Sequence, residues 1–262
     1  MAQNRVGIVG AGAAGCAVAC FARGQNLTLF DNGEPLRTLL YTGGGRCNLA
    51  HAQYDFKELA KNYPRGEKFL YSVFSRFATT QTLEFFKEIG VDTYTQEDDR
   101  IFPKSNSAKD VREKILNHTY KNKAKFIKEN VYKIEKINDV FIINEKYEFD
   151  KIVISTGGHS EYAIIKSLGH SIIEPKPALV GLITEQKHGL EGVSLKNIEI
   201  KVGKRTFNGD MLFTKNGVSG PIIYTISSIF ARTDYGKNNP LKLSINFGIK
   251  DLELDKNGKK EV

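Results

Sequence analysis

The sequence has no long apolar run, few cysteines and no cluster of metal-binding residues. Spanning a bilayer takes about 20 consecutive apolar residues, and no segment has them. Because the first apolar strand begins almost at Met1, we expect no signal peptide. These absences lead us to expect no membrane partner and a cytoplasmic protein.

The cysteines and histidines are few, and their spacing argues against a disulfide framework, a metal site and a Ser–His–Asp set. Cys16, Cys20 and Cys47 form no CxxC pair and no even set, so we expect no disulfide framework. Cys16 and Cys20 are one helical turn apart and are expected to pack in the core. The five histidines are scattered, which predicts no metal site, and no Ser–His–Asp set is supported. Internal repeats are also absent.

The chain has 262 residues, 40% of them hydrophobic and 26% charged, which suits one large or two moderate domains. The net charge of +8 either helps to bind RNA or an anionic cofactor, or reflects a lysine-rich solvated surface. Basic and acidic residues alternate from Lys109 to Lys151. The solvated surface is therefore the favoured interpretation.

The stretch Val6–Gly15, VGIVGAGAAG, reads as a short apolar strand that runs into a GxGxxG loop and a helix. A second apolar run, Leu27–Phe30, then ends at Asp31. This order predicts a βαβ unit that binds the ADP half of a dinucleotide. Gly10 permits a tight turn, Gly12 lets a pyrophosphate approach the backbone, and Gly15 lets the helix pack on the strand. The carboxylate can accept hydrogen bonds from ribose hydroxyls.

A second glycine cluster, Thr42-Gly43-Gly44-Gly45-Arg46-Cys47-Asn48, follows the βαβ unit. Consecutive glycines expose backbone N–H groups and allow conformations that other residues avoid. The arginine beside them can pair with a phosphate. We interpret this segment as a ligand-binding loop, the alternative being a flexible loop.

The middle of the chain is predicted to be a helical insert followed by β-strands. Residues 55–90 have apolar residues at helical spacing, with Thr80 as a possible cap, Gly90 as a possible end, and aromatics expected in the core. Another helix is expected to begin at Ser107-Ala108. From Lys125 to Lys151 the residues alternate in a β-meander with a turn at Asn138-Asp139.

The meander leads into an apolar strand that ends in Thr156-Gly157-Gly158. Such a strand is typical of a buried parallel sheet, and its end is expected at the same edge as the Gly10 loop. Beyond Pro175 the pattern changes to short β-rich runs. The sequence therefore predicts an α/β fold, with a Rossmann-like domain over residues 1–174 and a second, mostly β domain over residues 175–262.

Six blocks together resemble one flavoprotein family, the aminoacetone-oxidase-like or BaiN/RdsA-type NAD(P)/FAD-dependent oxidoreductases. The blocks are VGIVGAGAAG, TGGGRCNLA, RIFPKSNSAKDV, IVISTGGHS, LGHSIIEPKPALVGL and LFTKNGVSGP. The resemblance implies a two-dinucleotide-binding FAD domain and a barrel-like second domain, which we expect to be incomplete here. It also implies FAD as the cofactor, with NAD(P)H as its reductant.

Carried onto this sequence, the resemblance implies FAD contacts from five places. The cofactor-binding candidates are Gly10, Ala11, Gly12, Ala13, Ala14, Gly15, Asp31, Asn32, Gly43, Gly44, Gly45, Arg46, Cys47, Asn48, Val131, Thr156, Gly157 and Gly158. Val131 is expected to open a meander strand and to meet adenine through its backbone. Arg46 and Cys47 are also the catalytic candidates, as a stabiliser of anionic flavin and as a proton donor. For Cys47 the alternative, and the one favoured, is a packed residue.

Several positions depart from the family pattern. Asp99 stands where glycine is common, Lys215 stands where histidine is usual, and the segment 159–170 is shortened. Family members also continue beyond the point that corresponds to Val262, so the chain is either a fragment or a shortened relative with weak FAD binding.

The predicted activity is hydride transfer from NAD(P)H through FAD to an acceptor. The resemblance implies several acceptors, either a small molecule such as an amine or a steroid-like enone, or uridine in ribosomal RNA. Two alternatives stay open: a non-catalytic binding module, and a plain NAD-binding dehydrogenase that would leave the second glycine cluster unexplained.

Overall fold

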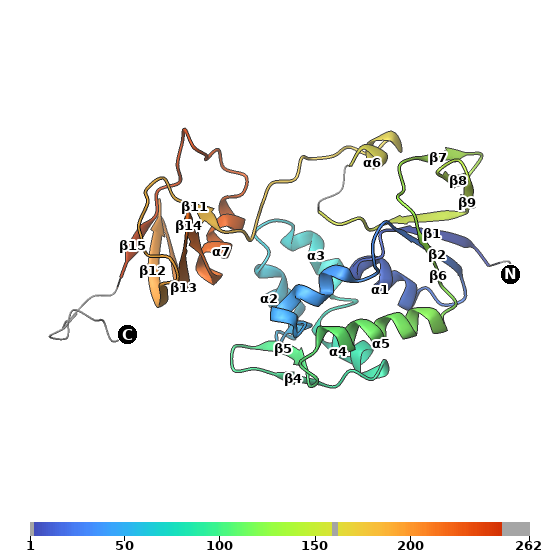
Figure 1. Cartoon of the computed structure of the whole chain (residues 1–262), viewed down its shortest axis with the longest axis horizontal. Helices are drawn as coiled ribbons and strands as arrows, with labels where there is room; N and C mark the ends of the chain where they lie inside the picture. The colour runs from blue at the N-terminus through green and yellow to red at the C-terminus, as the bar shows by residue number, and fades with distance from the viewer. Residues whose placement is uncertain (1–2, 159–161, 248–262) are drawn as a thin grey trace. The chain divides into compact units, whose positions relative to one another are not determined.

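The computed structural model describes residues 3–158 and 162–247, and the chain divides into two compact units, Met1–Ile173 and Glu174–Val262 (Figure 1). Each unit has a hydrophobic core of its own. Within the described ranges, no helix combines the length and the apolar character that crossing a membrane requires.

The first unit is an α/β domain built on a four-stranded parallel sheet in the order β10-β1-β2-β6. The strands are β1 (Arg5–Val9), β2 (Asn26–Asp31), β6 (Lys125–Lys128) and β10 (Lys151–Ile154). Successive side chains of a strand point to opposite faces. Ile8 and Leu29 therefore enter one core, and their neighbours Val9 and Phe30 enter another. Both faces of the sheet are covered, as a parallel sheet requires.

Two helices, α1 (Ala13–Phe21) and α5 (Ala108–Lys121), pack against one face of the sheet (Figure 1). The predicted start of α5 is confirmed, because the Ser107 hydroxyl accepts a hydrogen bond from the Asp110 N–H at 3.3 Å and caps the helix. The side chain of Asn122, at the other end of α5, donates to the carbonyls of Ala19 and Cys20. These bonds join the ends of the two helices.

A three-stranded antiparallel meander covers the other face of the sheet. Its strands are β7 (Ile134–Ile137), β8 (Val140–Ile143) and β9 (Tyr147–Phe149). The predicted turn at Asn138-Asp139 is confirmed, with φ values of 48° and 64° as in a type I′ turn.

The predicted meander was wrong over Lys125–Lys128, which forms β6 and pairs in parallel with β2. The reason is that β6 is a short edge strand, half-buried at its two central residues and exposed at its two lysines, so its short apolar centre resembles that of a meander strand. Phe126 packs against the helical side and Ile127 against the meander side. A two-residue period alone does not tell the two arrangements apart.

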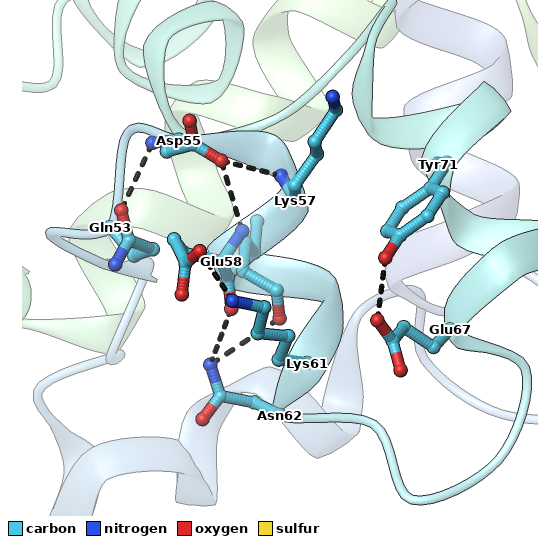
Figure 2. A network of polar contacts seen from close by, with 9 residues as sticks. Gln53, Asp55, Lys57, Glu58, Lys61, Asn62, Glu67 and Tyr71 are labelled. Atoms are coloured by element: carbon cyan, nitrogen blue, oxygen red, sulfur yellow. Dashed lines mark hydrogen bonds and ion pairs between the residues drawn. The ribbon is translucent and has the colours of Figure 1, made fainter.

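The insert between β2 and α5 contains helices and a small antiparallel sheet in the order β3-β5-β4. Its elements are α2 (Phe56–Lys61), α3 (Glu67–Phe74), α4 (Thr79–Glu88), β3 (Ala50–His51), β4 (Thr93–Thr95) and β5 (Arg100–Pro103). Figure 2 shows Asp55 capping α2 by accepting from the N–H groups of Lys57 and Glu58 at 2.8 and 3.0 Å.

Two predictions about the insert need correction. Thr80 does not cap α4, which begins one residue earlier, and the Gln81 side chain instead accepts from the Ala78 N–H. The aromatics are not all in the core: Phe85 packs there, whereas Phe69 on α3 is 74% exposed. Gly90 follows the end of α4 with a φ of 83°, as predicted.

The second unit is a five-stranded antiparallel sheet with the helix α7 (Pro221–Phe230) on one face. The strand order is β11 (Leu182–Ile183), β14 (Gly217–Ser219), β13 (Arg205–Thr214), β12 (Ser194–Val202) and β15 (Ser244–Asn246). Among residues 174–247, no pairing joins β11 to β15, so the barrel-like form is not shown there. The short helix α6 (Ala163–Ser167) belongs to the first unit.

Candidate dinucleotide-binding site

The glycine loop lies at the carboxyl edge of the parallel sheet, between the ends of β1 and β10. From β1 the chain builds the sheet outward through β2 to β6, and then adds β10 on the other side of β1. Ligands of open α/β sheets bind at such a reversal. Ser155 joins the two strand ends, because its hydroxyl donates to the Gly10 carbonyl at 2.8 Å. The predicted shared edge is confirmed.

The three glycines of the loop are required for different reasons. Gly10 has a φ of 97°, and a Cβ there would overlap the carbonyl of Ser155. A Cβ on Gly15 would overlap the carbonyl of Gly10. Gly12 differs, since a Cβ there would have no atom within 4 Å, and its φ of −76° suits any residue. The fold does not need a glycine at this position, whereas a ligand lying on the backbone does.

The residues around Gly12 fit a pyrophosphate. Ala11 is buried beneath the loop, whereas Ala13 and Ala14 are exposed in the first turn of α1. The first N–H groups of a helix have no partner within the helix and carry partial positive charge. The loop therefore offers an open cradle lined by hydrogen-bond donors.

Asp31, at the end of β2, is held beside the loop. One carboxylate oxygen accepts from the Ala11 N–H at 2.8 Å and the other from the Gly33 N–H at 2.9 Å. A carboxylate has about four acceptor positions, so two remain for ribose hydroxyls. The neighbouring Asn32 is exposed at the same edge.

The second glycine cluster forms the end of a kinked 3-10 segment, η1 (Arg37–Gly45). Gly43, Gly44 and Gly45 have φ values of 56°, 66° and 82°, a run that favours glycine. A Cβ on Gly43 would lie 2.8 Å from the ring of Phe102. The Leu49 N–H then donates to the Ile101 carbonyl. The GGGRCN and RIFP blocks are thus packed together.

Arg46 and Cys47 have different environments. The Arg46 guanidinium lies 4.2 Å from the centre of the Phe102 ring, and its Nε donates to the Gly43 carbonyl. Cys47 is 2% exposed in the core, and burial raises the pKa of its thiol, although a hydrogen bond with Thr42 opposes this rise. The thiol is therefore protonated and packed. Asn48 is exposed.

The remaining candidates follow β10 and β6. Thr156, Gly157 and Gly158 lie exposed just beyond β10, and a Cβ on either glycine would meet no atom within 4 Å. They share the edge with the Gly10 loop. The shortened segment 159–170 begins with three residues outside the described ranges.

Val131 does not open a meander strand, which corrects the prediction: β7 begins at Ile134, and Val131 lies in the connection after β6. Because Lys128 is paired with Asp31, this connection leaves the sheet at the edge that carries Asp31. Val131 was expected to open a strand because the whole stretch from Lys125 to Lys151 reads in the sequence as short alternating strands.

The sequence interpretation missed Asn144, which holds the segment around Val131 in place. Asn144 is 6% exposed; its oxygen accepts from the N–H groups of Tyr132 and Lys133, and its nitrogen donates to Glu129 and to the Asn130 carbonyl. The only signal was an asparagine between two short apolar runs, which is common for local reasons.

With this geometry in place, comparison with known proteins gives the family. Residues 4–219 match the HI0933-like protein Rossmann domain. The chain belongs to this family. The resemblance to BaiN/RdsA-type flavoproteins is thereby confirmed, and the HI0933-like match spans both glycine clusters, β10 and about half of the second unit.

Two curated proteins illustrate this HI0933-like group. The ribosomal RNA dihydrouridine synthase of Haemophilus influenzae is 26% identical over 251 residues, which cover 87% of this chain and 62% of that protein. The 3-dehydro-bile acid delta(4,6)-reductase of Clostridium scindens is 28% identical over an alignment 272 residues long. The alignment covers 94% of this chain and 64% of that protein. The chain spans less than two thirds of the length of these relatives.

Among solved structures, THI4 of Thermovibrio ammonificans is 12% identical with a TM-score of 0.41, over 63% of this chain and 61% of that one. Similarity at this level does not carry a function from one protein to the other.

Proposed function

We propose that the chain is the FAD-binding part of an NAD(P)H-dependent oxidoreductase. The observation that carries this proposal is the open space over Gly12, at the point where the sheet order reverses. Membership of the HI0933-like flavoprotein family supports FAD over NAD as the resident dinucleotide. A bound flavin supplies the capacity to accept and donate hydride.

Each part of the site has a distinct task in this proposal. The first turn of α1 and Gly12 hold the pyrophosphate, and Asp31 holds the ribose. The Gly43–Asn48 loop and Thr156–Gly158 lie toward the flavin. Arg46 supplies positive charge there, held against Phe102. Cys47 supports the loop from the core, and its burial leaves little access for proton donation.

The acceptor is proposed from the names of the relatives. A dihydrouridine synthase and a delta(4,6)-reductase both yield products with a saturated carbon–carbon bond. We therefore propose an acceptor with an activated carbon–carbon double bond, carried by a small molecule or by uridine in RNA. We further propose domain limits of 1–174 and 175–262, with the second domain part of a barrel-like form.

The test is the spectrum of the purified chain. We expect flavin absorbance, either as purified or after addition of FAD, and bleaching by NADH or NADPH without oxygen. Mass spectrometry of the released cofactor distinguishes FAD from NAD. Binding without bleaching would favour a binding module, and a chain that takes up no flavin would contradict the proposal.

The proposal that the acceptor is uridine in RNA has a separate test, which is based on the net charge of +8. Binding of ribosomal RNA should weaken steeply as salt rises, because lysines and arginines release counterions from phosphates. Absent or salt-independent binding would leave the small-molecule acceptor.

A further inference from the structure

Arg37 lies beside Asp31, and its side chain has no hydrogen bond or ion pair within the described part of the chain. A Cβ built on Gly33 would be 3.5 Å from an Asp31 carboxylate oxygen and 4.0 Å from both Cζ and Nη1 of Arg37. The two side chains therefore border the same space over Gly33. The nearby acid Glu34 faces two other cations instead, Arg112 at 3.6 Å and Lys128 at 4.0 Å.

The backbone fixes Arg37 at this place. Leu36, the preceding residue, has a φ of 57°, a conformation that is costly for a branched apolar residue. Two contacts hold it there: its N–H donates to the Ala11 carbonyl at 2.8 Å, and its side chain is 1% exposed in the core. The start of η1 is thus attached to the glycine loop, with Arg37 at the rim.

The charges at this rim are complementary to a phosphorylated nucleoside. Asp31 already accepts two backbone N–H groups and does not pair with Arg37. A guanidinium presents five donors in a plane and matches phosphate oxygens two at a time. A ribose held by the carboxylate would bring its phosphates within reach of an exposed arginine side chain.

We propose that Arg37 binds a phosphate attached to the adenosine at this site, an inference that rests on the proposed dinucleotide function. For FAD, the resident dinucleotide proposed above, that phosphate is on the 5′ side, and a phosphate on the ribose 2′ oxygen, as in NADPH, is the other source that the test distinguishes. Both sources present the same chemistry to the guanidinium. The sequence interpretation did not single out Arg37.

The test is calorimetric titration of the full chain with ADP, adenosine 2′-monophosphate and adenosine. The variants are Arg37→Gln and Arg37→Lys, with Arg76→Gln as a matched control, since Arg76 is exposed after α3. Arg37→Gln should weaken phosphate binding by about 10-fold to 100-fold, as expected for a lost charge-assisted hydrogen bond. Arg37→Lys should keep part of the affinity, and adenosine binding should not change.

The outcomes distinguish a 5′ phosphate from a 2′ phosphate, and they test the role of Arg37 separately from the dinucleotide site itself. A loss for ADP assigns the 5′ side, and a loss for adenosine 2′-monophosphate assigns the 2′ oxygen. Unchanged affinities in Arg37→Gln, or an equal loss for adenosine, would overturn the role of Arg37 alone. A wild-type chain that binds neither FAD nor any of the three ligands would overturn the dinucleotide site itself.

Discussion

Gly12 and Gly15 stand three residues apart, yet the fold constrains them in opposite ways. Gly15, in α1, lies against the Gly10 carbonyl, and a side chain there would prevent this close packing. Gly12 borders open space. From the sequence the two look equivalent within GxGxxG, and only the positions of neighbouring atoms separate a packing glycine from a binding one.

We therefore expect Gly12→Val and Gly15→Ala to separate binding from stability. Gly12→Val should reduce FAD or ADP affinity at least about tenfold, with a stability change within about 1 kcal/mol. Gly15→Ala should cost about 1–3 kcal/mol or more through overpacking. Urea unfolding and nucleotide titration of both variants measure this. A large destabilisation by Gly12→Val would show that the space is not open.

Asp99 shows how a residue departs from a family pattern without changing the backbone. Its φ is 60°, in the left-handed region. Glycine adopts this conformation freely, and aspartate tolerates it better than most residues do. The turn before Arg100-Ile101-Phe102-Pro103 is therefore kept. The sequence revealed the departure, and the dihedral angle explains why it is tolerated.

The cysteines are expected to be unreactive in the folded chain. Burial raises the pKa of Cys16 to about 12 and also raises the pKa values of Cys20 and Cys47. Thiolates react and thiols do not, so a thiol reagent at about pH 8 should label none of them until the chain unfolds. The unfolded state ionises first as pH rises, so these groups are expected to reduce stability above about pH 9. Rapid labelling of native Cys47 would restore it as a proton-donor candidate.

At the level of elements, the segment between β6 and β7 depends on one side chain from the next hairpin. Asn144 closes the β8–β9 turn with a φ of 51° and binds the segment 129–133 through both ends of its amide. Its partner Glu129 also accepts from the Tyr147 hydroxyl at 2.9 Å. The segment that carries Val131 is thus held by the meander.

Asn144→Ala should destabilise the chain by about 1–3 kcal/mol, because the amide's partners lose their hydrogen bonds. Asn144→Gly is the matched control, since it loses the same bonds but accepts the positive φ, and it should be less damaging. Denaturant unfolding of both variants gives the comparison. Equal stability of Asn144→Ala and wild type would contradict the holding role.

The hydrogen bonds from Asn144 and Tyr147 to Glu129 also make the stability of the chain depend on pH. Hydrogen bonds from Asn144 and then Tyr147 lower the pKa of Glu129. A lowered pKa in the folded state contributes stability above the unfolded pKa of about 4.5, and this contribution is lost as pH falls. The destabilisation by Asn144→Ala should therefore be smaller at about pH 3 than at pH 7. A constant difference across this range would argue against the Glu129 contact.

Element order was more predictable than element partners. The βαβ start, the capped α5 and the Asn138-Asp139 turn depend on local signals, and all three are present. The pairing of β6 with β2 and the exposure of Phe69 depend on which surfaces meet, which a local period does not encode. The site is similar: motifs identified the glycine clusters, whereas Asn144 acts on residues 11 to 15 positions earlier, and Arg37 is placed by the hydrogen bond from Leu36 to Ala11.

The whole molecule contains separate cores. The two cores of the first unit draw on residues up to Leu168, and that of the second begins at Leu182. Between them, residues 170–180 contain neither helix nor strand. The candidate residues of the nucleotide site all lie in the first unit.

Limited proteolysis should therefore cut first between His170 and Ala178 and leave two folded fragments. The N-terminal fragment should keep ADP binding, since its glycine loop and Asp31 are packed by its own core. Mass spectrometry locates the cut, and titration of the isolated fragment measures binding. Loss of ADP binding on cleavage would show that the second unit is needed for the site.

The parallel sheet has a consequence for synthesis of the chain. β1 can pair with β2 soon after both leave the ribosome, but its other neighbour arrives late, since Arg5 and its partner Asp150 are 145 residues apart. At about 5–20 residues per second, the second edge of β1 stays open for about 7–30 s. An open apolar edge pairs readily with other chains. The nascent chain is therefore most prone to aggregation, and most in need of a chaperone, until β10 has been made.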